Sequence, residues 1–538
     1  MLFVATNKHR GGNNVRNIFA LLCAIVALSG CATTSTKFAP SPDKQPPAAN
    51  EGIVVVSITG NTAQVNQFDE IALERKQEQK TPADLKAEFI LTLVSGRLSR
   101  DTAVFVGVLP EGEYFFRRFS DKDTRKFLAL SQSGSDLLGS FKVRPGKVAD
   151  LGRLIATPIN FRVLVGRSDI SRSNRELVTR FLPEFAKHYG GNVDEGWVRA
   201  RDGSDVAERY AMTHPIGSTS LVEMKNGEVA AATRMGTVLL RDANGRWRRA
   251  VSGKLESLLW VTPSDGTDSG ILAAGEFNTL LHLDRRGQFR SLDSGDLPPG
   301  NILFIDGNDS VGWHIAHQSG EDVFIFRASS LSAPKWERLA QEKIGSSFWS
   351  GQEKFFIWRT SRGFAYGVSK GDIHVYDYTS RAWSHRRVPK DSHLAQIVVS
   401  PGDVWGVTTS PGGGFGGIFA GMYYSRDFGQ TWTEPNWPFK IKVQSPMFTA
   451  KGTMLAVGGA FGKNELQGSV DDGKTWTPIT ERSLLPGTVW IMPTTGLFLV
   501  SDRLGVENIE NSANDGANWK IEFSTFEKAL FDQQTEKK

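Results

Sequence analysis

Apolar runs and short polar turns alternate along the C-terminal part of the chain. One phrase recurs there: a run rich in β-branched or aromatic residues, a turn rich in Asp, Asn and Gly, and an aromatic residue that opens the next run. Copies include TVLLRDANGRWRRAV, LLHLDRRGQFRSL, VFIFRASSLSAPKWERL and IHVYDYTSRAWSHRRV. Two further strand-like runs precede the turn, such as SLVEM and EVAAAT in the first copy. Each copy therefore predicts four strands.

The spacing of these aromatic residues predicts the fold class. They follow one another at intervals of 42, 47, 47, 49, 44 and 43 residues: Trp247, Phe289, Trp336, Trp383, Trp432, Trp476 and Trp519. A period of about 40 to 50 residues with four strands per repeat is typical of β-propeller blades. We therefore predict an all-β chain with a seven-bladed β-propeller at residues 215–525, closed into a ring that leaves only short edges.

Three of the turns carry a sharper motif. SRDFGQTW and SVDDGKTW both read Ser-x-Asp-x-Gly-x-Thr-Trp, and SANDGANW is a degenerate copy. The motif resembles the Asp-box, or BNR repeat, of sialidase-type propellers. Its side-chain oxygens can accept turn N–H groups, its Gly supplies a positive φ, and its Trp fixes the turn to a neighbouring sheet. These residues are therefore expected to be structural: Ser425, Asp427, Gly429, Thr431, Trp432, Ser469, Asp471, Gly473, Thr475, Trp476, Ser512, Asn514, Gly516 and Trp519.

A ligand face is expected on the other side of the ring. In a propeller the loops between the second and third strands lie opposite the Asp-box turns, and propellers usually bind their ligands there. On that face we expect a polar, mildly basic set with one aromatic tip: Arg234, Glu276, Asn278, His317, Lys370, Phe415, Lys463, Asn464 and Arg503.

Two function classes follow from the resemblance. Asp-box propellers include sialidases and other glycosidases, so a glycan-acting hydrolase is the alternative function. A sialidase resemblance implies a Phe-Arg-Ile-Pro phrase early in the ring, and the nearest phrase, Phe161-Arg162-Val163, precedes the ring. The ring also resembles non-enzymatic assembly-factor propellers with BNR-like repeats, of the photosystem assembly type. We therefore expect a non-catalytic binding or assembly platform, with no catalytic residue, no metal and no cofactor assigned.

The N-terminus predicts a lipid anchor. Lys8, Arg10 and Arg16 precede an apolar run at 18–28, which is too short to span a bilayer as a helix. The following Leu-Ser-Gly-Cys resembles the lipobox of bacterial lipoproteins. That resemblance implies a signal peptide at 1–30 and lipidation of Cys31, with palmitate among the fatty acids. Since Ala32 follows, it also implies an outer-membrane location facing the periplasm, with exposure at the cell surface left open.

The chain between the anchor and the ring divides into three parts. Residues 31–50 are rich in Pro, Thr, Ser and Ala and are expected to form a flexible tether. Residues 51–166 contain strand-like runs and the phrase LPEGEY, and they resemble transthyretin-like or carboxypeptidase-regulatory modules, which implies a small β-sandwich. Residues 167–214 are expected to be a partly helical linker, because apolar residues recur there at helical spacing before Gly190 and Gly191. A polar tail is expected at 526–538.

The cysteine count and the net charge limit the chemistry and the partners that we expect. Besides Cys31 the chain has only Cys23, which lies in the predicted signal, so no disulfide or thiol chemistry is expected in the mature protein. The formal net charge of +5 falls to +2 once the three basic residues of the signal are removed. This near balance argues against nucleic acid as a partner. The expected partners are the membrane, through the anchor, and an envelope protein or a glycan.

Overall fold

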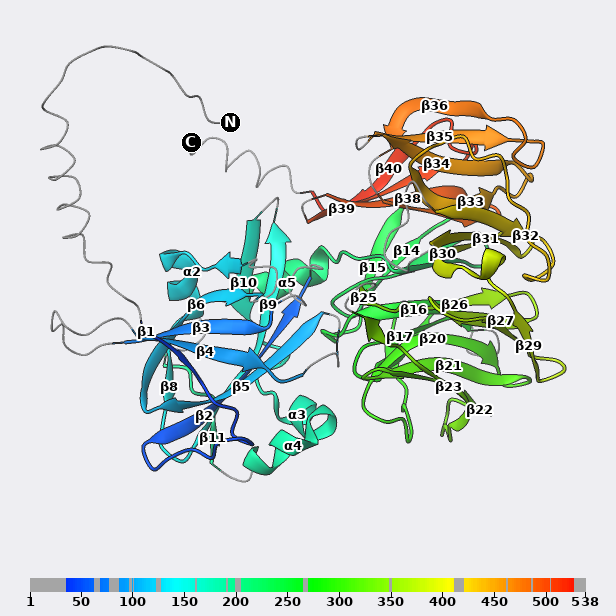
Figure 1. The fold of residues 1–538 in the computed structure, drawn as a ribbon. Coiled ribbons are helices and arrows are strands. Elements are labelled where there is room, and N and C mark those ends of the chain that lie inside the picture. Colours follow the sequence, from blue (N-terminus) through cyan, green and yellow to red (C-terminus); the bar gives the residue numbers. More distant parts are fainter. Residues whose placement is uncertain are drawn as a thin grey trace, which may run out of the picture.

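Two all-β domains lie side by side in the computed structural model (Figure 1). It describes residues 35–61, 68–76, 87–95, 99, 101–121, 127–159, 162–189, 192–198, 205–264, 270–347, 351–410, 420–460, 463–484, 487–503 and 505–526. The predicted signal at 1–30, Cys31, Phe415 and the tail from 527 onwards lie outside these residues. No helix among the described residues is long and apolar enough to cross a membrane.

The N-terminal domain is built on one curled sheet of eleven strands, which forms a half-barrel. Its hydrogen-bonded path runs β10-β9-β2-β5-β4-β3-β6-β7, with β1 beside β4, β11 beside β9 and β8 beside β6. A sandwich was expected from the sequence, but here the strands are continuously paired into a single sheet. The strands are β1 Ser35–Phe38, β2 Glu51–Gly60, β3 Glu70–Arg75, β4 Ala87–Leu93, β5 Thr102–Pro110, β6 Gly112–Ser120, β7 Phe127–Ala129, β8 Phe141–Val143, β9 Val148–Ile159, β10 Arg162–Arg167 and β11 Val193–Asp194.

Short helices cover parts of this sheet. They are α2 Gln132–Leu138, α3 Arg175–Phe181, α4 Pro183–Ala186, the 3-10 turn η2 Lys187–Tyr189, and α5 Val206–Thr213. The apolar side of α3 and α4 packs on β2 and β5, with Phe181 and Phe185 against Val55 and Val106. Pro183 opens α4, and the helix breaks at Leu182, because proline is tolerated in the first turn and not in a helix interior. The predicted linker is thus part of the domain core.

Residues 35–50, expected to be part of a flexible tether, are folded onto the domain. β1 pairs in parallel with the first half of β4, whose edge there is not occupied by β5. Ala39 is 5% exposed, and its N–H donates to the carbonyl of Ile90. Asp43 forms an ion pair with Lys187, with Oδ1 and Nζ 2.8 Å apart. A free strand edge offers hydrogen bonds to any extended segment, which explains why a Pro- and Ala-rich stretch is held there.

The second domain is the predicted seven-bladed propeller, which is confirmed. Its blades are successive antiparallel sheets: β12 Ser220–Glu223, β13 Val229–Ala232, β14 Thr237–Arg241 and β15 Trp247–Val251; β16 Leu258–Ser264, β17 Gly270–Gly275, β18 Leu280–Asp284 and β19 Phe289–Ser291; β20 Asn301–Asn308, β21 Gly312–Ser319, β22 Asp322–Ala328 and β23 Glu337–Lys343; β26 Phe355–Thr360, β27 Gly363–Val368, β28 Ile373–Asp377 and β29 Ala382–Arg386; β30 His393–Ser400, β31 Val404–Ser410 and β32 Gly421–Ser425; β33 Lys442–Phe448, β34 Met454–Ala460, β35 Lys463–Ser469 and β36 Thr477–Leu484; and β37 Thr488–Met492, β38 Gly496–Arg503, β39 Val506–Ser512 and β40 Lys520–Ser524. A hairpin of β24 Ser346–Ser347 and β25 Gly351–Gln352 joins blades three and four, and the 3-10 turn η3 Pro389–Asp391 joins blades four and five.

Blade five has three strands where four were expected. Its fourth strand is reduced to one bridge, in which Tyr424 and Thr433 exchange two hydrogen bonds of 2.9 Å. Continuing this antiparallel register would place Pro435 opposite Met422. Proline has no N–H to donate to a strand partner, so the fourth strand ends there.

The three sharp turns share one hydrogen-bond pattern. In the first, the Asp427 carboxylate accepts from the backbone N–H of Thr431 at 2.9 Å and from its hydroxyl at 2.6 Å, while Ser425 Oγ accepts from the N–H of Gly429 at 2.8 Å. Asp471 and Ser469 repeat these bonds in the second turn. In the third, Asn514 accepts from Asn518 N–H at 2.9 Å. Positive φ values at Gly429, Gly473 and Gly516 tighten the turns.

The aromatic residue after the turn connects each of several blades to the one before it. The indole N–H of Trp336 in blade three donates to the carbonyl of Ser294 after blade two at 2.8 Å, and Trp432 donates to the carbonyl of Arg387 at 3.0 Å. Trp476 donates likewise to the carbonyl of Asn436. The same tryptophans also pack against the apolar clusters of the blades, so each contributes both a hydrogen bond and apolar contact.

The ring closes between blades seven and one without sharing a strand. Each of these two blades is continuous in sequence, and their facing sides bury Leu239, Phe498 and Ile509 in one apolar cluster. At the outer edge, Arg241 makes two hydrogen bonds to Glu522, at 2.7 and 2.9 Å, with side chains only 9% and 6% exposed. Trp247 also donates to Glu522 at 3.2 Å, and Glu223 accepts from the N–H groups of Thr494 and Thr495 at 2.8 Å each, so side-chain packing, a buried ion pair and hydrogen bonds hold this seam.

The blade-to-blade indole bond gives a testable prediction. Trp336→Phe removes the donor to the buried contact with Ser294, which should cost about 1 to 2 kcal/mol of unfolding free energy beyond the loss of ring volume. Trp519→Phe is the matched control, because no described residue accepts from the buried Trp519 indole N–H. Urea unfolding of both variants should give a lower midpoint for the Trp336 variant. Equal midpoints would show that these bonds do not hold the blades.

Candidate functional site

A cluster of polar residues joins the N-terminal domain to the ring, and we call Asp101, Arg234, Ser257 and Glu276 the domain junction. Asp101 precedes β5, and its Oδ2 accepts from Arg234 Nε at 2.9 Å and from Ser257 Oγ at 2.7 Å. Its own N–H donates to Glu276 Oε1 at 3.1 Å. The side chains of Arg234 and Asp101 are 12% and 7% exposed. The domain junction is therefore a buried network and not a solvated surface.

Apolar contacts between the N-terminal domain and three blades surround the domain junction. Phe277 of blade two packs edge-on against Phe181 of α3 with ring centroids 4.9 Å apart. Met235 and Leu255 of blade one pack against Ile155 and Ala211. Pro158 approaches Gly505 of blade seven so closely that a Cβ there would lie 2.4 Å from Pro158 Cβ. Blades seven, one and two thus present their loops to the N-terminal domain.

Two further carboxylates, the buried Glu507 and the half-buried Glu256, bind groups near the point where the chain enters the ring. Arg153 Nη1 lies 3.0 Å from Glu256 Oε1; burial acts to raise the pKa of Glu256, but the Arg153 guanidinium holds it below its usual value. Glu507 accepts from the N–H of Gly217 and from the N–H and hydroxyl of Ser218. Burial nevertheless raises the pKa of Glu507. These groups fix the segment through which the chain enters the ring.

Asn278 and His317 join blades two and three next to the domain junction, since Asn278 lies two residues after Glu276. Asn278, in the left-handed region at φ 55°, donates to the carbonyl of Pro298 at 2.8 Å, and its Oδ1 lies 2.8 Å from His317 Nε2. Burial lowers the pKa of His317 to about 4, so the ring is neutral near pH 7. We assign the proton to Nε2 because the partner atom is an amide oxygen.

The expected ligand face is therefore divided by the N-terminal domain. Arg234, Glu276, Asn278 and His317 are brought together, but as buried or nearly buried groups that hold domains and blades. Lys370 lies in the open loop after β27 and pairs with Glu353 at 3.4 Å. Lys463 and Asn464 begin β35, and Arg503 ends β38. Among the described loops on this face, those of blades three and four contain exposed residues.

A groove on the rim of the ring is a second candidate site, which sequence reasoning missed. It holds about 750 Å³ between the end of blade four and the turn of blade five. We call it the rim groove, and its lining residues are His385, Arg386, Arg387, Val388, Pro389, Lys390, Tyr423, Gly429, Gln430, Trp432 and Glu434. The run HRRVPK, which carries three of its cations, is the sequence signal that could have indicated it.

Cations and aromatic rings meet in the rim groove. Lys390 Nζ lies 2.7 Å from Glu434 Oε2 and 5.5 Å from the centroid of the Tyr423 ring. Hydrogen bonding to Glu434 and Tyr423 raises the pKa of Lys390 to about 12, so it stays charged. Arg386 donates to the carbonyl of Phe428, whereas Arg387 is exposed. The arrangement can bind an anionic group beside a planar or apolar one.

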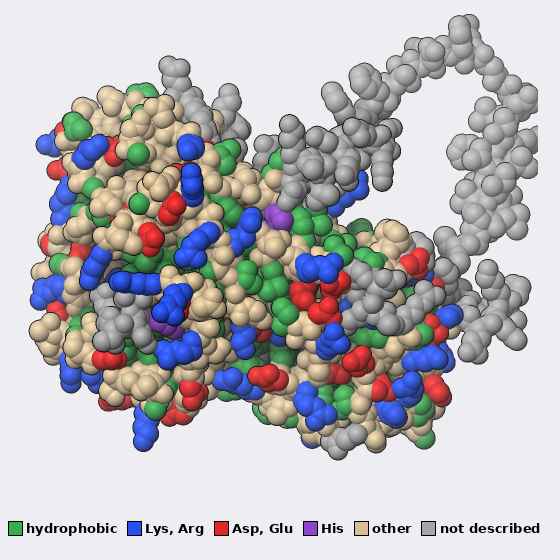
Figure 2. Space-filling model, turned by 180° about the vertical axis from the view of Figure 1, so that it is seen from behind, with side chains coloured by type: hydrophobic (Ala, Val, Ile, Leu, Met, Phe, Trp, Pro, Cys, Tyr) green, Lys and Arg blue, Asp and Glu red, His purple; other side chains and the backbone are tan. Residues whose placement is uncertain are grey.

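Basic side chains are distributed over the surface of the ring. On the face seen in Figure 2, Lys and Arg side chains spread over the ring with fewer Asp and Glu among them. No group of three or more His, Cys, Asp or Glu that could hold a metal ion occurs in the part of the chain that the structure describes.

The opposite face of the ring contains a tyrosine bound to a carboxylate. Asp306 in blade three accepts from Tyr378 at 2.8 Å and from Thr262 at 3.1 Å, and it lies 2.6 Å from Arg359. Burial, followed by the Asp306 charge, raises the pKa of Tyr378. The Tyr378 hydroxyl is thus a donor that joins blade four to Asp306 of blade three.

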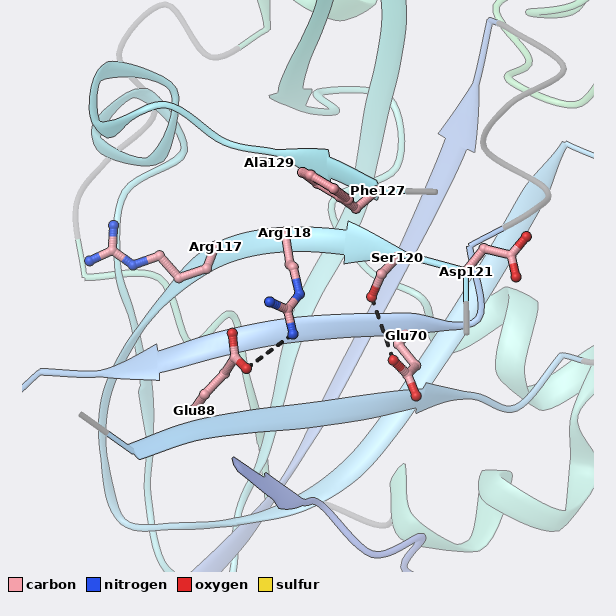
Figure 3. A pocket seen from close by; sticks show the side chains of 8 residues that line it. All are labelled: Glu70, Glu88, Arg117, Arg118, Ser120, Asp121, Phe127 and Ala129. Atoms are coloured by element: carbon pink, nitrogen blue, oxygen red, sulfur yellow. Dashed lines mark hydrogen bonds and ion pairs between the residues drawn. The ribbon is translucent and has the colours of Figure 1, made fainter. Parts of the chain in front are cut away.

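The N-terminal domain has a groove of its own, shown in Figure 3, of about 470 Å³. Strands β3, β4 and β6 form its floor, where Arg118 Nη2 lies 3.1 Å from Glu88 Oε2 and Ser120 donates to Glu70 at 3.5 Å. Phe127 and Ala129 of β7 line one side. Both arginines of this groove already have carboxylate partners, since Arg118 is paired with Glu88 and Arg117 lies 2.7 Å from Glu74.

Comparisons with known proteins find similar solved structures at low sequence identity. No family model and no curated protein matches the chain. Solved structures that resemble it include YCF48 bound to D1 peptide, with 12% identity, 49% of this chain and 81% of that chain covered, and a TM-score of 0.35. The β-propeller domain of Myceliophteria thermophila Cps50 (Swd1) matches at 12% identity over 55% of this chain and 98% of that one, with a TM-score of 0.35. An ancestral GH74 enzyme matches at 13% identity over 58% of this chain and 47% of that one, with a TM-score of 0.38.

The domain junction gives a stability prediction. Asp101→Ala leaves Arg234 largely buried without its carboxylate, which should lower the unfolding free energy by about 3 to 5 kcal/mol. The control is Asp472→Asn, which removes the charge of the exposed ion pair with Arg426 and keeps a residue type that tolerates the positive φ of 58° at this position; it should cost at most about 1 kcal/mol. Urea unfolding followed by tryptophan fluorescence measures both. A loss for Asp101 no larger than for Asp472 would mean that the junction does not hold the two domains.

Proposed function

We propose that this chain is an outer-membrane lipoprotein, facing the periplasm, whose propeller is a non-catalytic binding or assembly platform for an envelope protein or a glycan. The Leu-Ser-Gly-Cys phrase that ends at Cys31 supports the anchor. The propeller fold supports the platform, since a ring of blades offers broad loop faces on a rigid frame.

The rim groove is the observation that carries the proposal. It is the larger of the two grooves described above, at about 750 Å³, and it combines Arg387 and Lys390 with the rings of Tyr423 and Trp432. Arginine and aromatic side chains are the types that dominate binding energy at interfaces. A partner that places a carboxylate or phosphate beside an apolar or planar group fits this chemistry.

Rigid support strengthens the case for a platform. The groove is held between blades four and five, and the ring is fixed to the N-terminal domain by the buried domain junction. Figure 1 shows β29 and β32, which flank the groove, on the side of the ring away from the N-terminal domain. A partner can therefore approach the groove without displacing either domain.

The anchor is tested by Cys31→Ser. Acyl chains contribute about 0.8 kcal/mol for each CH₂ buried in the bilayer, so their loss should move the protein from the membrane fraction to the soluble periplasmic fraction. Fractionation after a salt wash, together with metabolic labelling by a palmitate analogue, measures this. A variant that stays with the membrane would require another anchor and would contradict the proposal.

The rim groove is tested by Arg387→Glu in a pull-down from solubilised membranes. Reversing an exposed charge at a charged contact should reduce partner recovery by about tenfold, without lowering the unfolding midpoint. Arg426→Glu is the matched control, because it reverses another partly exposed ring arginine outside the groove. Equal recovery with both variants would assign the partner to another face, and no specific partner with the wild-type ring would contradict the platform.

A further inference from the structure

The distance between the predicted anchor and the folded domain is short. Ser35 is the first described residue and begins β1, four residues after Cys31. An extended chain covers at most about 3.6 Å per residue, so Ser35 lies within about 14 Å of Cys31. A lipidated Cys31 would therefore hold the β1 side of the N-terminal domain close to the bilayer surface.

The strand register shows which side chains share the face of the sheet at that edge. Side chains alternate between the two faces of a strand, and directly paired residues point to the same face. Starting from Phe38 in β1, the paired row runs through Ile90 in β4, Ala72 in β3 and Arg118 in β6 to Ala129 in β7. Phe127 lies two residues before Ala129, so it shares the same face.

The other face of these strands is the domain core. Phe89 and Leu91 of β4, Ile71 of β3 and Phe119 of β6 alternate with the row above and are buried in one apolar cluster. The row with Phe38, Arg118 and Phe127 is therefore turned away from the core. We call it the outer face.

Two aromatic side chains flank the outer face. Phe38 is 65% exposed and Phe127 is 67% exposed, which makes them the most exposed phenylalanines among the described residues. Between them lie the Arg118–Glu88 ion pair and the Ser120–Glu70 hydrogen bond (Figure 3). Aromatic side chains at the margins with paired charges between them suit a membrane–water interface, where rings enter the headgroup level and charges stay hydrated.

The position of the outer face within the molecule agrees with such a contact. Figure 1 shows β1 at the end of the N-terminal domain farthest from the propeller. All residues of the outer face belong to the N-terminal domain, so the proposed contact with lipid uses no residue of the ring.

We propose that the outer face lies on the bilayer in which Cys31 is anchored, with Phe38 and Phe127 in the headgroup region. This inference rests on the lipid anchor of the proposed function and adds an orientation to it. The occupant is a lipid surface, and a second protein on this face is a competing outcome of the test.

Single-cysteine labelling tests the orientation. Once Cys31 is acylated and the signal is removed, the mature chain has no other cysteine, so Phe38→Cys and Phe127→Cys each supply a single free thiol. Both sites are exposed, so neither substitution opens a core cavity. The full-length acylated proteins carry an environment-sensitive fluorophore and are reconstituted into phosphatidylethanolamine–phosphatidylglycerol vesicles that contain a spin-labelled quencher lipid.

Two matched controls use exposed apolar residues elsewhere. Ile170→Cys lies in the same domain, where Ile170 is 47% exposed, and Val470→Cys lies on a ring turn, where Val470 is 90% exposed. We expect quenching at positions 38 and 127 to exceed that at both controls by at least about twofold, because quenching requires contact with lipid.

The outcomes separate this inference from the proposed function. Mature protein that carries no acyl chain overturns both proposals. Acylated protein in which position 38 or position 127 is quenched no more than Ile170 overturns this inference alone. A blue-shifted but unquenched label at both positions overturns it too, because a protein partner then covers the outer face.

Discussion

No blade of this propeller can bury both of its faces alone, and this constraint governs the rest of the structure. Blade one packs one face against blade two through Leu240 and Val261 and the other against blade seven through Leu239 and Ile509. A row of such sheets leaves an apolar face exposed at each end unless it closes. Here it closes without a shared strand, so the seam depends on apolar packing and on the buried pair of Arg241 and Glu522.

The N-terminal domain is also held by apolar and charged groups that would be exposed if it separated from the ring. Separating the two domains would expose Phe277 and Phe181 and would leave Arg234 and Asp101 to be rehydrated apart. Buried charges accept few alternative partners, and a network of this kind therefore favours one docking geometry over others. The loops of blades seven, one and two serve that attachment, which leaves the described loops of blades three and four and the rim groove for other contacts.

The proposed anchor, the N-terminal domain and the propeller follow one another along the molecule. The segment that follows Cys31 is bound to the edge of β4 from Ser35 onwards, so little free chain separates the proposed anchor from the sheet. A short connection restricts the approach of the domain to a membrane, whereas a long tether would not. The rim groove lies at the other end of the molecule, where a partner in the periplasm would meet it.

The sequence by itself determined the local and periodic features. Trp247 to Trp519 marked all seven blades, since each turn and its aromatic residue form within one repeat. Contacts between distant segments were decided only by the tertiary structure: the pairing of β1 with β4 and the single curled sheet. Arg234 and Glu276 have the composition of a ligand face, and only the packing of the N-terminal domain against the ring turned them into a buried junction, because burial depends on partners that the local sequence does not contain.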